Sequence, residues 1–229
     1  AELLRKYGLE NAVLECVDTG KLVNDCINEV ANDTPMHFQW YAELIDKTFG
    51  KVSPTDPSIT SLIVKEPIGV VAGVVPWNFP LMMAVWKAAP ALAAGCSVII
   101  KPAEDTPLSA LRIAQIAKEA GIPDGVFNVV PGFGDVGESL GRHNDVDAVS
   151  FTGSTEVGGL FMKYSGESNL KTIGLEMGGK SPFLVLEDAK INDTLIDNAI
   201  NSAFWNGGQN CSANMRQIIH RKVKDEFLD

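Results

Sequence analysis

The chain has 229 residues, of which 45% are hydrophobic, and its formal net charge at pH 7 is −10. The composition predicts a folded core and excludes a disordered chain, and the negative charge argues against a nucleic-acid surface. No apolar run approaches the ~20 residues of a membrane span, and the first residues lack the pattern of a signal peptide. The cysteines, Cys16, Cys26, Cys96 and Cys211, have no metal-ligand spacing and need not be paired. We therefore expect no metal site and a reducing compartment, the cytoplasm or an organelle matrix.

Residues 1–50 are predicted to be helical. Apolar residues recur every three to four positions as far as Gly50, which ends the pattern. Residues 51–61 are rich in Pro, Ser, Thr and Asp and are expected to form a loop. Two β-branched runs, 59–65 and 69–75, are separated by Glu66 and Pro67 and are predicted to be strands.

Helical and strand patterns alternate along the rest of the chain. Strands joined by crossover helices build a parallel, doubly wound α/β sheet. A second unit, with the order strand, helix, strand, is expected from Ser181 onward, and 222–229 has the pattern of an amphipathic helix. The expected helices are 81–94, 107–120, 136–142, 155–165 and 192–205, and the expected strands are 97–101, 126–130, 148–151, 171–175, 183–186 and 216–220.

Cys211 lies in a loop whose composition suits a nucleophile. The run Asn206-Gly-Gly-Gln-Asn-Cys-Ser surrounds one thiol with small residues and amides. The two glycines remove side-chain bulk, so the backbone can approach a substrate closely, and a thiolate is an intrinsically strong nucleophile. An isolated cysteine is more often a packing residue, so this loop alone leaves both interpretations open.

Two motifs fall at the ends of predicted strands, where open parallel sheets bind ligands. Phe151 closes a strand, and Gly153 to Gly158 opens a helix, whose N-terminus favours the charge of a pyrophosphate. The alternative is a simple helix N-cap at Ser154. Lys101 ends another strand and Glu104 follows three residues later. Their carboxylate and ammonium can hold the hydroxyls of a ribose, or they can form a solvated ion pair.

Two further residues are candidates for chemistry at a carbonyl group. Asn78 lies inside Pro76-Trp-Asn-Phe-Pro80, where two prolines stiffen the turn and two aromatic residues pack it. Its amide can donate to the oxyanion of a tetrahedral intermediate, and removing such a donor costs roughly 3–4 kcal/mol of barrier. Alternatively, it bonds its own backbone as a turn residue. Glu176 follows a β-branched strand and precedes a Gly-Gly turn, so it is either a general base or a surface glutamate.

Taken together, five segments resemble the NAD(P)-dependent aldehyde dehydrogenase superfamily, in the family's order and close to its spacing. The segments are Val75-Pro-Trp-Asn-Phe-Pro80, Lys101-Pro-Ala-Glu-Asp-Thr-Pro107, Phe151-Thr-Gly-Ser-Thr-Glu-Val-Gly158, Leu175-Glu-Met-Gly-Gly-Lys-Ser-Pro182 and Gly207-Gly-Gln-Asn-Cys211. The resemblance favours the branch that oxidises amino- and glutamyl-aminobutyraldehydes. It implies a Rossmann-like NAD-binding domain over 1–177, with an oligomerisation arm near 52–68, and the first part of a catalytic domain over 178–229. Members of that family are much longer, so the chain is expected to be a fragment without activity of its own.

The resemblance also implies roles for individual residues. Cys211 forms a thiohemiacetal and then a thioester with the aldehyde, Asn78 and the Cys211 N–H bind the oxyanion, and Glu176 activates the water that releases the acid. Lys101 and Glu104 hold the adenosine ribose, and the charge of Glu104 favours NAD over NADP, which remains possible. The other implied contacts with the cofactor are Val75, Pro76, Trp77, Gly134, Gly137, Gly153, Ser154, Val157, Gly158, Leu175 and Gly178.

Met83 and Trp86 follow Asn78 at a spacing that places them on one face of a helix. They are expected either to line the substrate tunnel or to pack in the core.

The implied partners are a small aldehyde and further copies of the subunit in a homodimer or homotetramer, without nucleic acid or membrane. Three alternatives remain open. The first is a CoA-acylating semialdehyde dehydrogenase, in which CoA resolves the thioester, although Glu176 argues against it. The second is a catalytically silent structural protein of the same fold. The third is a thiol hydrolase without a dinucleotide, which would leave Lys101 and Glu104 unexplained.

Overall fold

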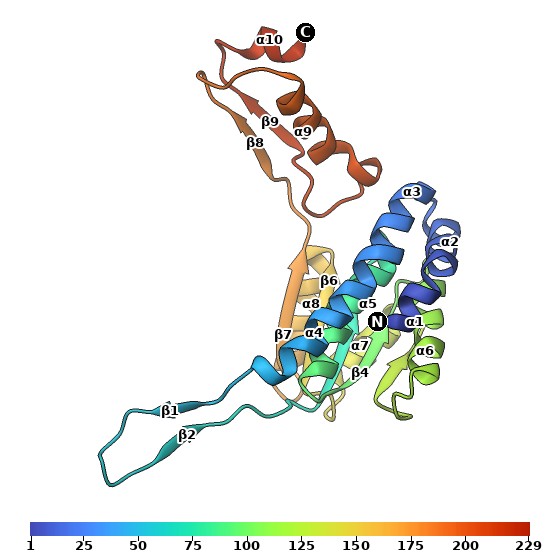
Figure 1. Ribbon diagram of the computed structural model, residues 1–229, viewed down its shortest axis with the longest axis vertical. Coiled ribbons are helices and arrows are strands. Elements are labelled where there is room, and N and C mark those ends of the chain that lie inside the picture. The colour runs from blue at the N-terminus through green and yellow to red at the C-terminus, as the bar shows by residue number, and fades with distance from the viewer. The chain divides into compact units, whose positions relative to one another are not determined.

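The computed structural model describes residues 1–229, and the chain divides into two compact units, unit 1 (Ala1–Glu176) and unit 2 (Met177–Asp229). The helical elements of unit 1 are α1 (Glu2–Lys6), α2 (Gly8–Thr19), α3 (Val23–Cys26), the π-helical segment η1 (Ile27–Asp33), α4 (Thr34–Leu44), the 3-10 turn η2 (Ile45–Lys47), α5 (Pro80–Ala93), α6 (Leu108–Glu119), α7 (Gly134–Arg142) and α8 (Thr155–Gly166) (Figure 1). The strands of unit 1 are β1 (Lys51–Ser53), β2 (Ser61–Ile63), β3 (Val70–Val74), β4 (Ser97–Lys101), β5 (Phe127–Val129), β6 (Ala148–Gly153) and β7 (Thr172–Met177), which runs across the boundary.

Five strands of unit 1 form one sheet in the order β5-β4-β3-β6-β7. Strand β3 pairs in parallel with both β4 and β6, and β4 pairs in parallel with β5. The register sets Val74 opposite Lys101 on one side and Phe151 on the other. These strands therefore end at one edge of the sheet, and the segments that follow them start from the same edge.

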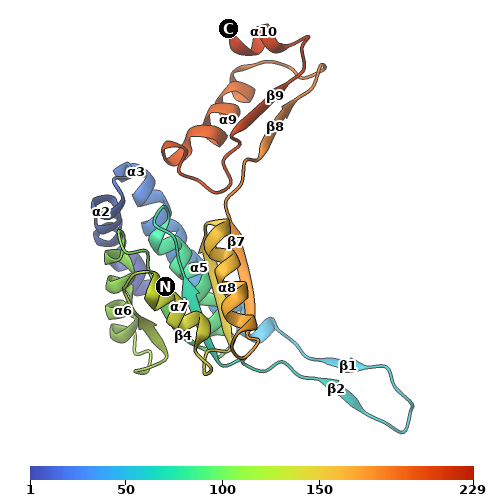
Figure 2. The same cartoon turned by 180° about the vertical axis from the view of Figure 1, so that it is seen from behind.

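Helices cover both faces of this sheet (Figure 2). Val71 packs against a cluster that α5 shares with β4, whereas Ala72 and Val74 belong to a second cluster that contains Phe161 of α8. Successive side chains of a strand point to opposite faces, so these two clusters lie on opposite sides of β3. This is the doubly wound α/β architecture predicted from the alternation of elements, and the prediction is confirmed.

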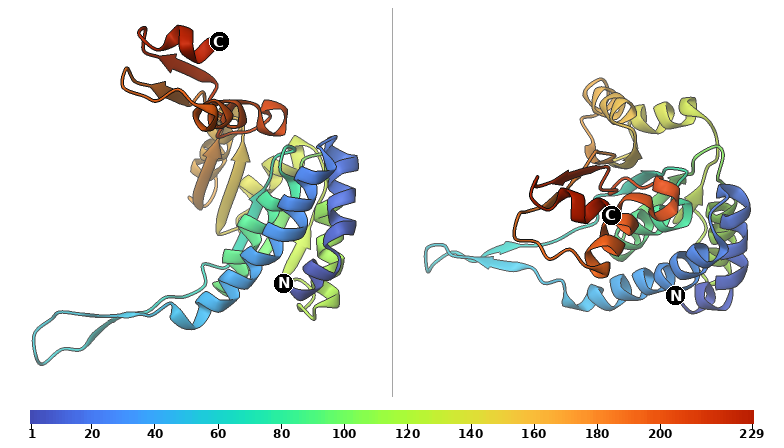
Figure 3. Two further views of the ribbon diagram at one scale, coloured as in Figure 1. Left: turned by 45° about the horizontal axis from the view of Figure 1, so that its top comes forward. Right: turned by 90° about the horizontal axis from the view of Figure 1, so that it is seen from above.

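Strands β1 and β2 form a separate antiparallel hairpin, with Lys51 paired to Ile63, that extends away from the sheet of unit 1 (Figures 1 and 3). The prediction of a loop over 51–61 is wrong, because this stretch contains β1. The run 59–65 pairs back with β1, whereas 69–75 supplies the central strand β3. A strand of three residues is too short to show an alternation, so the turn residues dominated the pattern.

Unit 2 contains the predicted order of strand, helix and strand. Strands β8 and β9 pair in parallel, with Pro182 opposite Arg216. Asn192 caps the helix between them, because its side-chain oxygen accepts the Leu195 N–H at 2.9 Å. The elements of unit 2 are β8 (Pro182–Val185), α9 (Asp193–Phe204), the 3-10 turn η3 (Trp205–Gly208), β9 (Arg216–Ile219) and α10 (Lys224–Leu228).

The other predicted elements from the second strand run onward occur in the structure, with ends that shift by one or two residues. None of the helices has both the length and the apolar character that crossing a membrane requires.

Candidate active site

The turn that carries Asn78 leaves the carboxyl end of the central strand and is held at both ends. At its start, the Val75 N–H donates to the Lys101 carbonyl oxygen at 3.1 Å, which continues the pairing of β3 with β4. At its end, the Leu81 N–H donates to the Glu15 carboxylate at 3.0 Å. The half-buried Asn78 therefore sits in a segment whose two flanks are fixed. Of its predicted neighbours, Val75 is buried, Pro76 is half-buried and Trp77 is exposed.

Lys101 and Glu104 form an anchored ion pair at the end of the neighbouring strand. The Lys101 side chain is only 6% exposed, whereas the Glu104 side chain is 47% exposed, and 3.4 Å separates their charged atoms. Lys101 also donates to the Pro102 carbonyl oxygen at 3.0 Å. Hydrogen bonding to its own backbone N–H, together with the charge of Lys101, lowers the pKa of Glu104. The Lys101 ammonium is therefore held in a buried position, while the ionised Glu104 carboxylate faces solvent. In a fully solvated pair both groups would be exposed.

The end of β6 passes directly into helix α8. Ser154 caps this helix, because its hydroxyl oxygen accepts the Val157 N–H at 3.2 Å. A Cβ atom on Gly153 would lie 2.5 Å from the ring of Phe151, so a larger residue there would force that buried ring to move. Val157 is exposed and Gly158 is buried, both in the first turn of α8. The N-cap is thus present, and its helix begins at the edge of the sheet where a phosphate would be expected.

The remaining residues predicted to contact a cofactor differ in their surroundings. Gly134 is exposed at the start of α7, while Gly137 is buried, and a Cβ there would lie 3.7 Å from the ring of Phe161. Leu175 is half-buried and packs against the cluster of β3, β6 and α8. Gly178 is exposed and belongs to unit 2.

Met83 and Trp86, which the helical spacing places on one face, differ in their exposure. Met83 is 7% exposed and belongs to the cluster beneath α5, so it packs in the core. Trp86 is 49% exposed, and the centre of its ring lies 5.8 Å from that of His37. Of the two, only Trp86 presents its side chain to the surface of unit 1.

Lys87 was missed by the sequence reasoning, although it lies in the same helix. It is 7% exposed, and its ammonium donates to the hydroxyl of Thr152 at 2.7 Å and to that of Ser150 at 3.3 Å. Burial lowers the pKa of Lys87 to about 8, and the negative charge of Glu176 opposes this shift. The signal that could have found it is a single charged residue in an otherwise apolar helix.

Cys211 lies in unit 2, and its thiol is exposed. The segment before it has three consecutive residues in the left-handed region, at Asn206, Gly207 and Gly208, with φ of 54°, 64° and 76°. Residues other than glycine rarely adopt this backbone conformation, so the two glycines are needed to form the turn.

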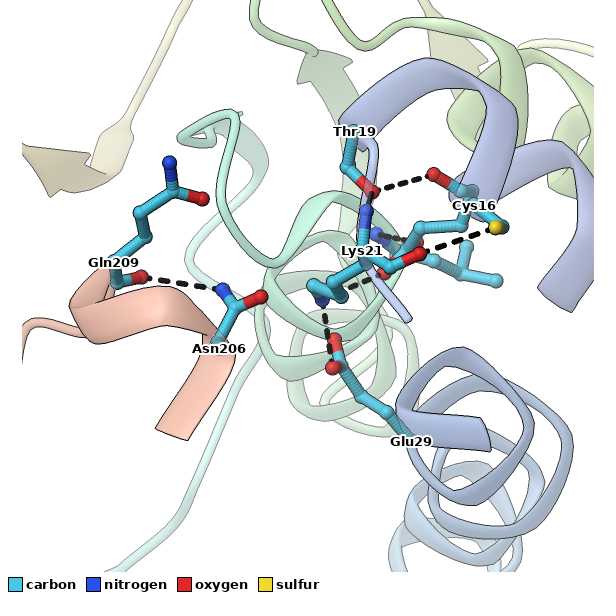
Figure 4. A network of polar contacts seen from close by, with 8 residues as sticks. Cys16, Thr19, Lys21, Glu29, Asn206 and Gln209 are labelled. Atoms are coloured by element: carbon cyan, nitrogen blue, oxygen red, sulfur yellow. Dashed lines mark hydrogen bonds and ion pairs between the residues drawn. The ribbon is translucent and has the colours of Figure 1, made fainter. Parts of the chain in front are cut away.

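Hydrogen bonds within the loop complete the turn. Asn206 donates to the Gln209 carbonyl oxygen at 3.3 Å (Figure 4), and the side-chain oxygen of Asn210 accepts the Ser212 N–H at 3.1 Å. The Cys211 sulfur lies 3.9 Å from that same Asn210 oxygen. The local fold of unit 2 therefore presents the thiol on a turn that its own residues define.

Of the predicted site residues, the structure gathers those of the β3, β4 and β6 ends at one edge of the sheet, and Glu176 belongs to the neighbouring strand β7. Asn78 and Glu176 lie in unit 1 and Cys211 in unit 2.

Comparison with known proteins finds relatives over the whole chain. The model of the aldehyde dehydrogenase family matches residues 1–229. The chain is 52% identical to the aminoacetaldehyde dehydrogenase of Pseudomonas aeruginosa, and the match covers 100% of this chain and 46% of the relative. It spans about half the length of the curated relatives that it matches.

Solved structures give the same result. The structure of a γ-glutamyl-γ-aminobutyraldehyde dehydrogenase from Burkholderia cenocepacia is 49% identical, with a TM-score of 0.97, and the match covers 99% of this chain and 46% of that one. A mutant of the indole-3-acetaldehyde dehydrogenase of P. syringae, in complex with NAD+, is 46% identical, with a TM-score of 0.97 and the same coverage of 99% and 46%.

Proposed function

Because this chain belongs to the aldehyde dehydrogenase family, we propose that the protein containing it oxidises an aldehyde to the carboxylic acid with NAD. The observation that carries the proposal is the common edge of the sheet in unit 1. There the turn of Asn78, the Lys101–Glu104 pair and the start of α8 follow the carboxyl ends of adjacent parallel strands. Relatives that act on aminoacetaldehyde and γ-glutamyl-γ-aminobutyraldehyde make amino aldehydes and their amides the first substrates to test.

The groups at this edge fit the adenosine half of a dinucleotide. Lys101 is buried and holds Glu104, whose exposed carboxylate can accept the two hydroxyls of a ribose. The N-terminus of α8, capped by Ser154, favours the charge of a pyrophosphate. Glu104 would repel a 2′-phosphate, so we propose NAD as the preferred cofactor, with NADP as a poorer one. When bound, NAD supplies the acceptor for the hydride of the aldehyde.

In the proposed reaction, the Cys211 thiolate attacks the aldehyde carbon and forms a carbon–sulfur bond. The carbonyl oxygen becomes an oxyanion, which accepts hydrogen bonds from the Asn78 amide and the Cys211 N–H. After oxidation the acyl group remains on Cys211 as a thioester. Glu176 takes a proton from water, the resulting hydroxide attacks the thioester carbon, and the carbon–sulfur bond breaks to release the acid and the thiolate.

Lys87 is proposed to support the carboxyl end of β6 from helix α5. It is a buried cation, and the negative charge of Glu176 favours its protonated form. Its hydrogen bonds to Ser150 and Thr152 keep the ammonium in place.

The β1–β2 hairpin is proposed to be the arm that contacts another subunit in a homodimer or homotetramer. Its apolar side chains are exposed, with Val52 at 72% and Leu62 at 62%. A short two-stranded hairpin with exposed apolar residues is not stable by itself in water, and such surface marks an interaction site. A second copy of the chain would cover it.

The test of the proposed function is Cys211→Ala. We expect the variant to lose NAD-dependent oxidation of amino aldehydes, followed as NADH absorbance, while NAD still binds, because the thiol forms the covalent intermediate but does not hold the adenosine half. Cys96→Ala is the matched control, since Cys96 is a free, buried thiol of unit 1. Oxidation by Cys211→Ala at the wild-type rate would refute the assignment.

The same assay separates the alternatives. Acid release without CoA excludes a CoA-acylating enzyme. A wild-type protein that binds NAD but oxidises no aldehyde would indicate a structural member of the family. Hydrolysis of thioesters without any NAD binding would indicate a thiol hydrolase.

A further inference from the structure

Unit 1 buries a cluster of three ionisable side chains that the proposed reaction does not use: Glu15, Lys21 and Glu29. Their side chains are 0%, 2% and 3% exposed. The Lys21 ammonium lies 3.2 Å from a carboxylate oxygen of Glu15. It lies 2.7 Å from a carboxylate oxygen of Glu29 (Figure 4). Removing charges from water is costly, and buried ion pairs are weak contributors to stability by themselves. The role of this triad therefore lies in its contacts with neighbouring segments.

Lys21 itself is fixed through its backbone as well as its ammonium. Its N–H donates to the Thr19 hydroxyl at 3.2 Å, and its carbonyl oxygen accepts the Cys16 thiol at 3.1 Å (Figure 4). The Thr19 hydroxyl in turn donates to the Glu15 carbonyl oxygen at 2.6 Å. The segment between α2 and α3 therefore sets the position of the ammonium.

Two members of the triad contact the residues that directly follow Asn78. The second carboxylate oxygen of Glu15 accepts the Leu81 N–H at 3.0 Å. The Lys21 ammonium lies 4.3 Å from the centre of the Phe79 ring, within the range of a cation–π contact. Phe79 is 4% exposed and Leu81 is fully buried, so both contacts are shielded from water.

The contact with Leu81 fills a need of helix α5. The first N–H groups of a helix have no partner inside it, and Pro80, the first residue of α5, has no N–H. Leu81 therefore carries the first donor of the helix, and no side chain at the N-cap position accepts a hydrogen bond. Glu15, from α2, provides the missing acceptor, and its negative charge suits the positive end of the helix.

We propose that Glu15, Lys21 and Glu29 form a positioning device for the Asn78 amide, and that they act on catalysis only through that amide. Glu15 fixes the backbone at Leu81, three residues after Asn78. Lys21 fixes the ring of Phe79, the residue next to Asn78, and Glu29 holds the Lys21 ammonium in place. The proposal rests on the proposed function, in which Asn78 donates to the oxyanion. Oxyanion donors must be aimed accurately, because a misplacement of ~1 Å costs about a hundredfold in rate.

A double-mutant cycle tests whether the triad acts through Asn78. In the protein that contains this chain, kcat/KM for an amino aldehyde is measured for Lys21→Met, Asn78→Ala and the combined variant. We expect Asn78→Ala to lose about a hundredfold to a thousandfold and Lys21→Met about tenfold to a hundredfold. The combined variant should be no slower than Asn78→Ala, because once the Asn78 amide is removed, the loss of the residues that position it has no further effect on the rate. NAD affinity should stay at the wild-type value in all three.

Lys171→Met is the matched control for loss of a buried lysine. Lys171 is 5% exposed and donates to the Gly141 carbonyl oxygen at 2.7 Å. It should leave kcat/KM near the wild-type value. If Lys21→Met does not fold, Glu15→Gln replaces it in the cycle, because glutamine keeps the volume and one acceptor for Leu81 while removing the charge.

Losses from Lys21→Met and Asn78→Ala that multiply in the combined variant, or a Lys21→Met enzyme with the kcat/KM of the wild type, would overturn the proposal. An inactive wild type, or Asn78→Ala at full activity, would instead refute the proposed function. In that case amide hydrogen exchange still tests the contact, because Glu15→Leu should raise the exchange rate of the Leu81 N–H at least tenfold over wild type and over Lys171→Met. An unchanged rate would show that Glu15 does not hold this turn.

Discussion

Replacing the buried Lys87 by methionine should remove a rise in the free energy of unfolding that the wild type shows at alkaline pH. The lysine is 7% exposed, and burial lowers its pKa from the usual 10.5 to about 8. Between these two values the folded chain has released the proton while the unfolded chain still binds it. Stability therefore rises with pH across this window and is constant below it.

The size of the effect follows from the shift. Each unit of pKa corresponds to 1.36 kcal/mol, so the move from 10.5 to about 8 is worth about 3 kcal/mol. Relative to Lys87→Met, the wild type should gain about 2–3 kcal/mol in free energy of unfolding between pH 8 and pH 10. At pH 7 the variant should be at least as stable as the wild type, because methionine has a volume similar to that of lysine and carries no charge that must be buried.

Urea unfolding at pH 7, 8, 9 and 10, followed by circular dichroism, measures this difference. Subtracting the curve of Lys87→Met from that of the wild type cancels the titration of all other groups. Lys118→Met is the matched control for loss of an exposed lysine, because the Lys118 side chain is 77% exposed. Parallel curves for Lys87→Met and the wild type would mean that Lys87 is not a desolvated cation, and the reasoning would be wrong.

Three further predictions concern other parts of unit 1. Burial raises the pKa of Glu29 from 4.5 to about 8, so its stabilising contribution is complete below pH 4.5 and is lost as the pH rises through 8. In urea unfolding at pH 5 to 8, the wild type should therefore lose a few kcal/mol relative to Glu29→Gln, and a constant difference would contradict the burial of a protonated carboxyl. Glu104→Gln should weaken NAD binding and reduce the discrimination against NADP, measured by titration calorimetry; affinities for NAD and NADP that fall in parallel would speak against a ribose contact. Leu62→Lys, on the exposed hairpin, should shift the protein to smaller assemblies in size-exclusion chromatography with light scattering, and an unchanged mass would remove the hairpin from the subunit interface.

The architecture could be predicted because its signals are local. A strand or a helix shows its period within ten residues, and the alternation of the two is enough to indicate a parallel sheet with crossover helices. The edge of that sheet then places the segments after Val74, Lys101 and Gly153 together, since parallel strands end on one side. The turn before Cys211 is likewise local, because Asn206, Gly207 and Gly208 themselves adopt the left-handed conformation that forms it.

Strand β1 and the electrostatics could not be predicted in this way. Strand β1 exists because β2 pairs with it, and three residues carry no period of their own. Met83 and Trp86 have the spacing of one helix face, yet neighbouring elements bury the first and leave the second exposed.

By itself, the sequence determined the α/β architecture, the order of its elements and the residue types available for chemistry. Only the tertiary structure decided which charged groups are buried and what they hold. Glu15 reaches the N–H of Leu81 across 66 positions of sequence, and Lys87 meets Thr152 across 65. A residue's polarity is a property of its side chain, but its desolvation and its hydrogen-bond partners come from distant elements that folding brings against it.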